Sequence, residues 1–193
     1  MTAQINDTIL YQNEEYALAG INGAGLFVPQ ELGLETAAAC TACWRGYLCQ
    51  YEVADGRLRL RQLSISFPRP TMNAIERGEP SPTVLGKPGR VEPGRWYCLY
   101  EDLRTEMPFS GGLLLGAGFI RELYVHMGFH PAWKYRKVCE LSFDQGGLTA
   151  ARDRSAEMAR CREELAGQPL GPDDEQPEAV RGWIQQCFRR DYR

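Results

Sequence analysis

The fold is decided by the stretch GYLCQYEVADGRLRLRQLSISF, residues 46–67. Its first part, 46–53, alternates with a period of two, and one set of side chains comprises Tyr47, Cys49, Tyr51 and Val53. This period is typical of a β-strand with one buried face. Ala-Asp-Gly at 54–56 then supplies a tight turn, so the stretch predicts a β-hairpin.

The returning strand, 57–67, contains a break in its alternation. Its large apolar residues change parity after residue 60, and they are Leu58, Leu60, Leu63, Ile65 and Phe67. In a regular strand the two sets would point to opposite faces. One extra residue near Arg61 or Gln62 returns both sets to the same face, so the sequence predicts a β-bulge there.

Outward from this hairpin, other segments also favour β-structure. Residues 8–11 and 15–19 predict a first hairpin, which the following glycines are expected to end. Single strands are expected at 95–99 and 112–116. Residues 137–143, with the turn Asp-Gln-Gly-Gly that follows, predict a last hairpin. The pattern indicates a mainly antiparallel sheet built from hairpins.

Three segments predict helices. Apolar residues at helical spacing define a central helix, which Gly128 is expected to end, and they are Phe119, Ile120, Leu123, Tyr124 and Met127. Charged, helix-favouring residues fill 155–166. An amphipathic helix is expected from Pro177, with one apolar stripe made of Val180, Trp183, Ile184, Cys187 and Phe188. The fold class expected is therefore α+β.

The domain organisation follows from composition. Residues 68–95 contain six prolines and few large apolar side chains, so a long surface loop is expected there. We expect one α+β domain over 1–167, a polar linker at 168–176, and the amphipathic helix at 177–193. A helix this short is marginal alone, so its stripe must pack on the domain or on a partner.

Charge and hydropathy exclude several classes of protein. The chain has 193 residues, a net charge of −3 and an isoelectric point near 5.5, which argues against a general nucleic-acid binder and favours a basic partner. Residues 1–19 lack a positively charged start and a long apolar run, so no signal peptide is expected. No apolar run is long enough for a membrane span. We expect a cytoplasmic protein with reduced thiols.

The stretch 40–49 contains three of the seven cysteines, which raises the possibility of a metal site. Cys40 and Cys43 form a CxxC pair, and His126 with His130 could complete a Cys2His2 set for zinc. Only one such pair is present, and the predicted helix ends between or just after the histidines. The interpretation that these cysteines are packing side chains of a sheet is favoured, and no cofactor is expected.

Other chemical signatures are incomplete. The glycines at 20–25 have the spacing GxxGxG rather than that of a phosphate-binding loop, so a turn between two β segments explains them better. A redox CxxC would precede a helix, whereas here the following residues alternate as in a strand. A cysteine with either histidine and an acid could be assembled on paper, but no spacing favours one set.

Aromatic and acidic residues are more suggestive of a binding surface. Tyrosine, tryptophan and arginine often anchor protein interfaces. Trp133 and Tyr135 lie in an aromatic segment, and Glu101, Asp102 and Glu106 offer negative charge that would speed the encounter with a basic partner. These five residues are the partner contacts that the sequence predicts.

A resemblance supports a binding role. YxxxEYALAGINGAGLF, TACWRGYLCQYEVADGRL and GGLLLGAGFIRELYVHMGF, followed by WKYRKVCEL, resemble in their order a group of uncharacterised bacterial proteins over about residues 7–150. In type the chain is similar to immunity proteins, which neutralise toxins. The resemblance implies a non-enzymatic immunity protein that occludes a cognate bacterial toxin. The alternative is an enzyme that uses a cysteine thiol or a bound metal.

Overall fold

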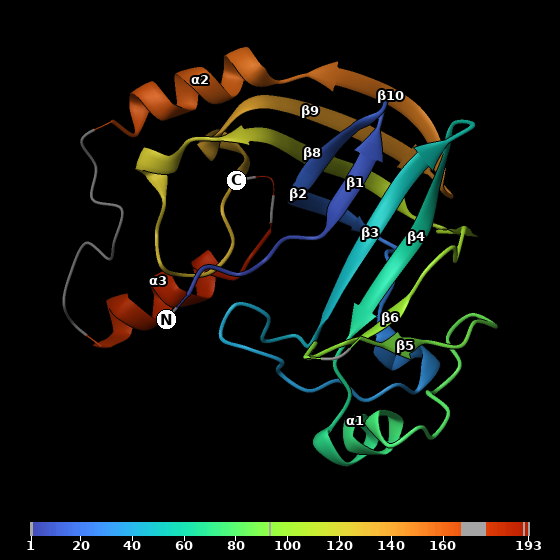
Figure 1. Cartoon of the computed structure of the whole chain (residues 1–193). Coiled ribbons are helices and arrows are strands. Elements are labelled where there is room, and N and C mark those ends of the chain that lie inside the picture. Colours follow the sequence, from blue (N-terminus) through green and yellow to red (C-terminus); the bar gives the residue numbers. More distant parts are fainter. Residues whose placement is uncertain (1, 93, 167–176, 191, 193) are drawn as a thin grey trace.

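The computed structural model describes residues 2–92, 94–166, 177–190 and 192, and its sheet closes into a barrel (Figure 1). The strands follow the order β10-β9-β8-β2-β1-β3-β4, and Gly147 of β10 pairs with Arg57 of β4 to close the ring. These strands are β1 (Thr8–Tyr11), β2 (Glu14–Ala24), β3 (Tyr47–Ala54), β4 (Arg57–Ile65), β8 (Ser110–Phe119), β9 (Tyr135–Asp144) and β10 (Gly147–Asp153).

The sequence predicted the α+β class and a mainly antiparallel sheet built from hairpins, and the structure corrects this sheet to a closed barrel. Non-local pairings make the difference, and besides β2 with β8 there are two more in the ring. β1 pairs with β3 in parallel, with Thr8 opposite Gln50, and β10 pairs with β4. Each joins strands that no short turn connects, so the local pattern of hairpins does not specify them.

The central hairpin is confirmed together with its bulge. β3 pairs antiparallel with β4, and Gln50 lies opposite Gln62 whereas Tyr51 lies opposite Leu60. Arg61 is therefore the extra residue. The bulge places both parities inside, because Leu58, Leu60, Leu63, Ile65 and Phe67 are all buried.

The first hairpin is also present, but the glycines after it do not end the strand. β2 continues to Ala24 and pairs with β8, so that Gly23 lies opposite Gly111. The two backbones approach closely, since a Cβ on Gly23 would lie 2.2 Å from the carbonyl oxygen of Ser110. The glycine-rich segment is thus a strand and not a turn, because the missing side chains let the backbones meet.

The predicted central helix is wrong. β8 runs to Phe119 and is followed by the 3-10 turns η2 (Arg121–Leu123) and η3 (Ala132–Lys134). Phe119 pairs with Tyr135 of β9 in the sheet. Short apolar runs fit helix and strand periods equally well, and here strand pairing decided the outcome.

The stretch 68–95 is more regular than its composition predicted. It contains α1 (Arg69–Glu76), which begins at a proline-rich segment as helices often do, and β5 (Arg90–Val91). Met72 and Val84 anchor it in the core. The remaining short elements are η1 (Pro29–Leu32), β6 (Cys98–Tyr100) and β7 (Thr105–Glu106).

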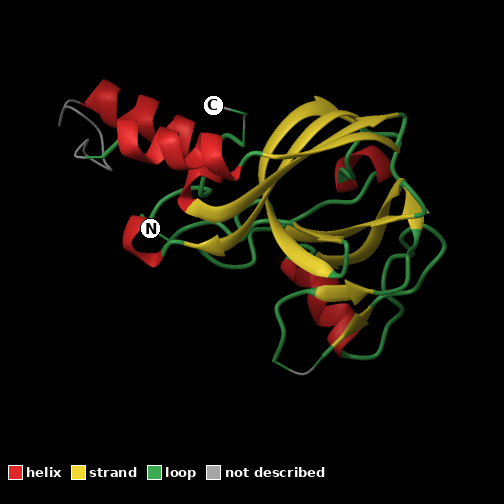
Figure 2. Ribbon diagram, turned by 90° about the horizontal axis from the view of Figure 1, so that it is seen from above, coloured by secondary structure: helices red, strands yellow, loops and turns green. Residues whose placement is uncertain are grey.

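Two helices lie outside the barrel on one side, as Figure 2 shows. They are α2 (Ser155–Glu164), close to the expected bounds, and α3 (Pro177–Cys187), which begins as expected but ends at Cys187 instead of continuing to residue 193. The predicted linker at 168–176 lies outside the described residues. None of the described helices is both long and apolar enough to cross a membrane.

The barrel interior is filled by side chains. Its largest fully buried members include Tyr51, Tyr100 and Phe109, surrounded by leucines and isoleucines from β1, β2, β4, β8 and β9. A second, smaller apolar cluster on the outside of β8 and β9 comprises Ala19, Leu114, Ala132, Tyr135 and Val138. The barrel is therefore a packed core and not a container.

The bulge can be tested by comparing two deletions in β4. Deletion of Arg61 removes the extra residue, so that Leu58 and Leu60 share one regular alternation with Leu63 and stay inward, and it should cost less than about 2 kcal/mol of unfolding free energy. Deletion of Arg59 leaves the bulge in place and turns Leu58 to the outer face, which should cost more than about 3 kcal/mol. Urea unfolding measures both variants. Equal stability of the two deletion variants would contradict the register.

Candidate functional site

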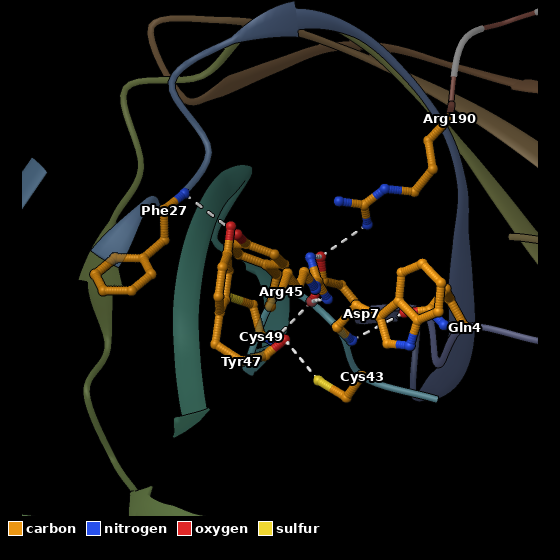
Figure 3. Close-up of polar contacts among 10 residues, drawn as sticks. Gln4, Asp7, Phe27, Cys43, Arg45, Tyr47, Cys49 and Arg190 are labelled. Carbon is orange, nitrogen blue, oxygen red and sulfur yellow. Dashed lines mark hydrogen bonds and ion pairs between the residues drawn. The ribbon is translucent and has the colours of Figure 1, made fainter. Parts of the chain in front are cut away.

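A buried ion cluster lies at one end of the barrel, around Asp7 (Figure 3). The Asp7 side chain is only 3% exposed. Arg45 donates to both carboxylate oxygens, with an Nη1 to Oδ2 distance of 2.8 Å. Arg190 Nη1 donates to Oδ2 at 2.9 Å, and the Cys49 backbone N–H donates to Oδ1 at 2.7 Å. Three segments that are distant in sequence therefore meet on one carboxylate.

Neighbouring hydrogen bonds fix the same three segments. The backbone N–H of Trp44 donates to Gln4 Oε1 at 3.0 Å, which joins the N-terminal segment to the loop before β3. The Arg190 carbonyl accepts the N–H of Ile21 in β2, and the Cys187 carbonyl accepts that of Phe129 at 2.6 Å. The C-terminal tail after α3 is thus held by its backbone as well as by its guanidinium.

The electrostatics of the cluster follow from its unequal charges. Burial alone would raise the pKa of Asp7, but the guanidiniums of Arg45 and Arg190 outweigh it and hold this pKa below its usual value. Burial would lower the pKa of Arg45, and the Asp7 charge raises it instead. One carboxylate faces two guanidiniums, so the cluster carries one net positive charge.

A partly exposed aromatic pair lies next to this cluster, because Trp44 precedes Arg45 in the chain. Trp44 is 47% exposed and stacks on Phe188 with ring centroids 5.0 Å apart. Ile5 is also exposed, and its N–H donates to the carbonyl of Ala42, which places it beside the loop that contains Trp44. We call Ile5, Trp44, Arg45, Phe188 and Arg190 the Trp44 patch. The sequence did not predict this patch, because Phe188 and Arg190 are far from Trp44 along the chain and come close to it only in the folded protein.

The structure places the predicted acidic contacts on the surface, but each is paired. Their ion pairs are Glu101 with Arg90 at 2.9 Å, Asp102 with Arg104 at 3.7 Å, and Glu106 with Arg57 and Arg59 at 2.9 and 3.7 Å. The arginines balance the negative charge locally, so these acids project little field of their own.

The predicted aromatic contacts lie elsewhere. Tyr135 is buried at the start of β9, and Trp133 is half-buried just before it. Glu106 lies beside β4, where it pairs with Arg59 in the sheet. Two residues away in β4, Arg57 pairs with Gly147, at the turn of the β9–β10 hairpin. That turn lies nine residues along β9 from Tyr135, or about 30 Å. The five predicted contacts therefore do not form one surface.

The cysteines and histidines of the metal hypothesis are also apart. Cys49 is buried in β3, Cys43 is buried in the preceding loop, and Cys40 is exposed. Among the described residues, no three His, Cys, Asp or Glu side chains are grouped so that they could hold a metal ion. His126 and His130 pack instead against the ring of Tyr124.

His130 is buried in an aromatic setting. It is 8% exposed, with its ring centroid 4.7 Å from that of Phe119 and 5.1 Å from that of Tyr124. Neither ring nitrogen has a hydrogen-bond partner among the described residues. Burial, and then the charge of Lys134, lower the pKa of His130 to about 4.

Comparisons with models of protein families, with curated proteins and with solved structures found no match to this chain.

The buried imidazole predicts a particular acid sensitivity. Its folded pKa of about 4 lies below the usual 6.5, so the unfolded chain takes up the proton first and stability falls as pH decreases from 6.5 to 4. The loss should reach about 3 kcal/mol, and His130→Phe should remove it. Urea unfolding between pH 7 and 4 measures this. The exposed His126, changed to Phe, is the matched control and should keep the wild-type slope. The same slope in His130→Phe would contradict the assignment.

Proposed function

We propose that this chain is a non-enzymatic protein-binding module, an immunity protein that binds and occludes a cognate bacterial toxin. The observation that carries the proposal is the Trp44 patch, where the exposed ring of Trp44 stacks on Phe188 and lies next to Arg45, which is held with Arg190 on a buried carboxylate. The nature of the partner rests on the resemblance in type to immunity proteins.

The packed barrel supports a function at the surface. Apolar side chains occupy the interior, and the largest of them are fully buried. Ligand-binding barrels keep an interior space for the ligand. Binding by this protein is therefore assigned to its outer face, where shape and charge carry the specificity.

The composition of the Trp44 patch favours a protein partner. Tryptophan and arginine are enriched among the residues that dominate binding energy at interfaces. Asp7 fixes Arg45 in one orientation through two hydrogen bonds, and Phe188 fixes the indole of Trp44 by stacking. Side chains ordered before binding lose less entropy when the partner arrives.

The acidic residues define a second test surface. A basic toxin would be steered by Glu101, Asp102 and Glu106 only if their arginine partners turn away, because the ion pairs balance the charge. The net charge of −3 still favours a basic partner at long range. The two surfaces make different contacts and can be tested separately.

For five of the seven cysteines, the geometry does not favour the alternative of an enzyme that uses a thiol. Catalytic cysteines have lowered pKa values. Here burial raises the pKa of the Cys43, Cys49 and Cys98 thiols. Burial is also the main cause that raises the pKa of Cys139 and Cys187.

Growth competition tests the proposal. A strain that lacks the gene should be inhibited when it is grown in contact with its parent, because the parent delivers the toxin, and a plasmid copy of the wild-type chain should restore growth. Trp44→Ala should restore it at least tenfold less well, since loss of an interface tryptophan costs about 2 kcal/mol or more. Leu32→Ala, which removes an exposed apolar side chain elsewhere, is the matched control.

The outcomes separate the parts of the proposal. Equal growth of the deletion strain and its parent in contact would refute the immunity function. Full complementation by Trp44→Ala, with failure of the triple change Glu101→Lys, Asp102→Lys and Glu106→Lys, would move the interface to the acidic residues. Circular dichroism of each purified variant excludes unfolding as the cause.

A further inference from the structure

A cavity opens beside α1, at the other end of the molecule from α2 (Figure 1). Its lining comes from the loop before β3, from the residues that follow β4, from α1 and from Trp96. The volume is about 260 Å³, just below the range of about 300–1,000 Å³ that holds drug-sized ligands, so the cavity suits a smaller molecule. We call it the α1 cavity.

The walls of the α1 cavity are held in place by the fold. Phe67 and Met72 line it and belong to the barrel core, with exposed fractions of 4% and 8%. The N–H of Ala37 donates to the Ser66 carbonyl at 2.9 Å, and the N–H of Ser66 donates to the Gly46 carbonyl at 2.7 Å. Both ends of this loop are therefore fixed beside β4. A site formed in advance loses less entropy when its ligand arrives.

One side of α1 contributes three polar residues to the cavity lining. Arg69, Asn73 and Glu76 lie four and three positions apart, so they share one side of the helix. Among the described residues, none of the ion pairs or side-chain hydrogen bonds involves these three, whereas the neighbouring Arg77 pairs with Glu79 at 3.2 Å. A guanidinium, an amide and a carboxylate at the cavity are thus available to a ligand.

The two charges stand at the unfavourable ends of α1. The peptide dipoles give a helix a partial positive charge at its N-terminus and a partial negative charge at its C-terminus, which favours acidic side chains in the first turn and basic ones in the last. Arg69 is the first residue of α1 and Glu76 is the last, so both oppose the dipole. A ligand that brings a carboxylate to Arg69 and an ammonium to Glu76 is attracted by the side chains and by the dipole alike.

We propose that the α1 cavity binds a small zwitterion with an apolar body, in particular a short peptide with free ends. Its carboxylate pairs with Arg69 and its ammonium with Glu76. Its apolar body lies on Phe67, Met72 and Trp96. The ends of α1 are about 10 Å apart, since each residue adds about 1.5 Å. An extended dipeptide spans up to about 7 Å, and the flexible arginine side chain covers the remaining distance.

Titration of the full-length protein with leucyl-leucine, a dipeptide with free ends, tests the proposal. The chain has four tryptophans, and the NMR signal of the Trp96 indole N–H is identified by its loss in Trp96→Phe. This signal should move in a saturable way with leucyl-leucine, while that of Trp44 should move little. The N-acetylated dipeptide lacks the ammonium, the amidated one lacks the carboxylate, and each should bind at least tenfold more weakly.

Uncharged variants assign the two ends of the peptide. Arg69→Gln should weaken the binding of leucyl-leucine at least tenfold but leave that of the amidated form unchanged, because this form has no carboxylate for Arg69 to hold. Glu76→Gln should act in the same way on the free and the acetylated forms. Arg77→Gln removes an exposed arginine outside the cavity lining, so it is the matched control and should bind as the wild type does.

Each outcome is decisive. Saturation with the single amino acid leucine, as tight as with leucyl-leucine, would narrow the ligand to a free amino acid. The proposal is overturned by the lack of a saturable Trp96 response to either molecule, by equal binding of the free and blocked dipeptides, or by unchanged binding in both Arg69→Gln and Glu76→Gln. The blocked dipeptides decide without any variant, so a variant that fails to fold leaves the test intact. The Trp44 patch shares no residue with the α1 cavity, and these results do not affect its proposed role.

Discussion

One buried carboxylate organises the end of the barrel where three distant segments meet. Asp7 precedes β1, Arg45 precedes β3, and Arg190 follows α3, so that 183 positions separate the first residue from the last. A charge this buried is stable only when it is paired and hydrogen-bonded. Two guanidiniums and the N–H of Cys49 meet that need. The Asp7 side chain thus joins the N-terminal segment, the cysteine-rich loop and the tail, in addition to their backbone hydrogen bonds.

This constraint links the fold to the proposed function. β1 pairs with residues 14–17 of β2. The C-terminal tail lies beside the following part of β2, because the Arg190 carbonyl accepts the N–H of Ile21. The same tail brings Phe188 onto Trp44. The stacking of Trp44 on Phe188 therefore depends on the position of the tail, which the ion cluster and the backbone hydrogen bonds hold together. Surface charge is mostly balanced within local arginine pairs, which leaves this end as the clearest candidate interface.

The parts of the fold that the sequence predicted are those set by local periodicity. The change of parity between Leu60 and Leu63 placed the bulge at Arg61, because side chains alternate strictly along a strand. Ring closure was not predictable in this way, since β1–β3 and β4–β10 join segments without a short turn. The segment after Phe119 satisfied a helical period but formed 3-10 turns. At the candidate site, Trp44 and Arg45 lie within the cysteine-rich stretch 40–49, which the sequence marks as unusual. No pattern in the sequence links these two residues with Arg190.

Amide hydrogen exchange tests most directly whether the ion cluster holds the tail. In Arg190→Met, compared with the wild type and with the exposed control Arg189→Met, the amides of Ile21 and Phe129 lose the carbonyls that protect them. Their exchange should become at least about tenfold faster, a difference of about 1.4 kcal/mol in the opening free energy. The Cys49 amide, still bonded to Asp7, should stay protected. Unchanged protection of Ile21 and Phe129 in Arg190→Met would contradict the account.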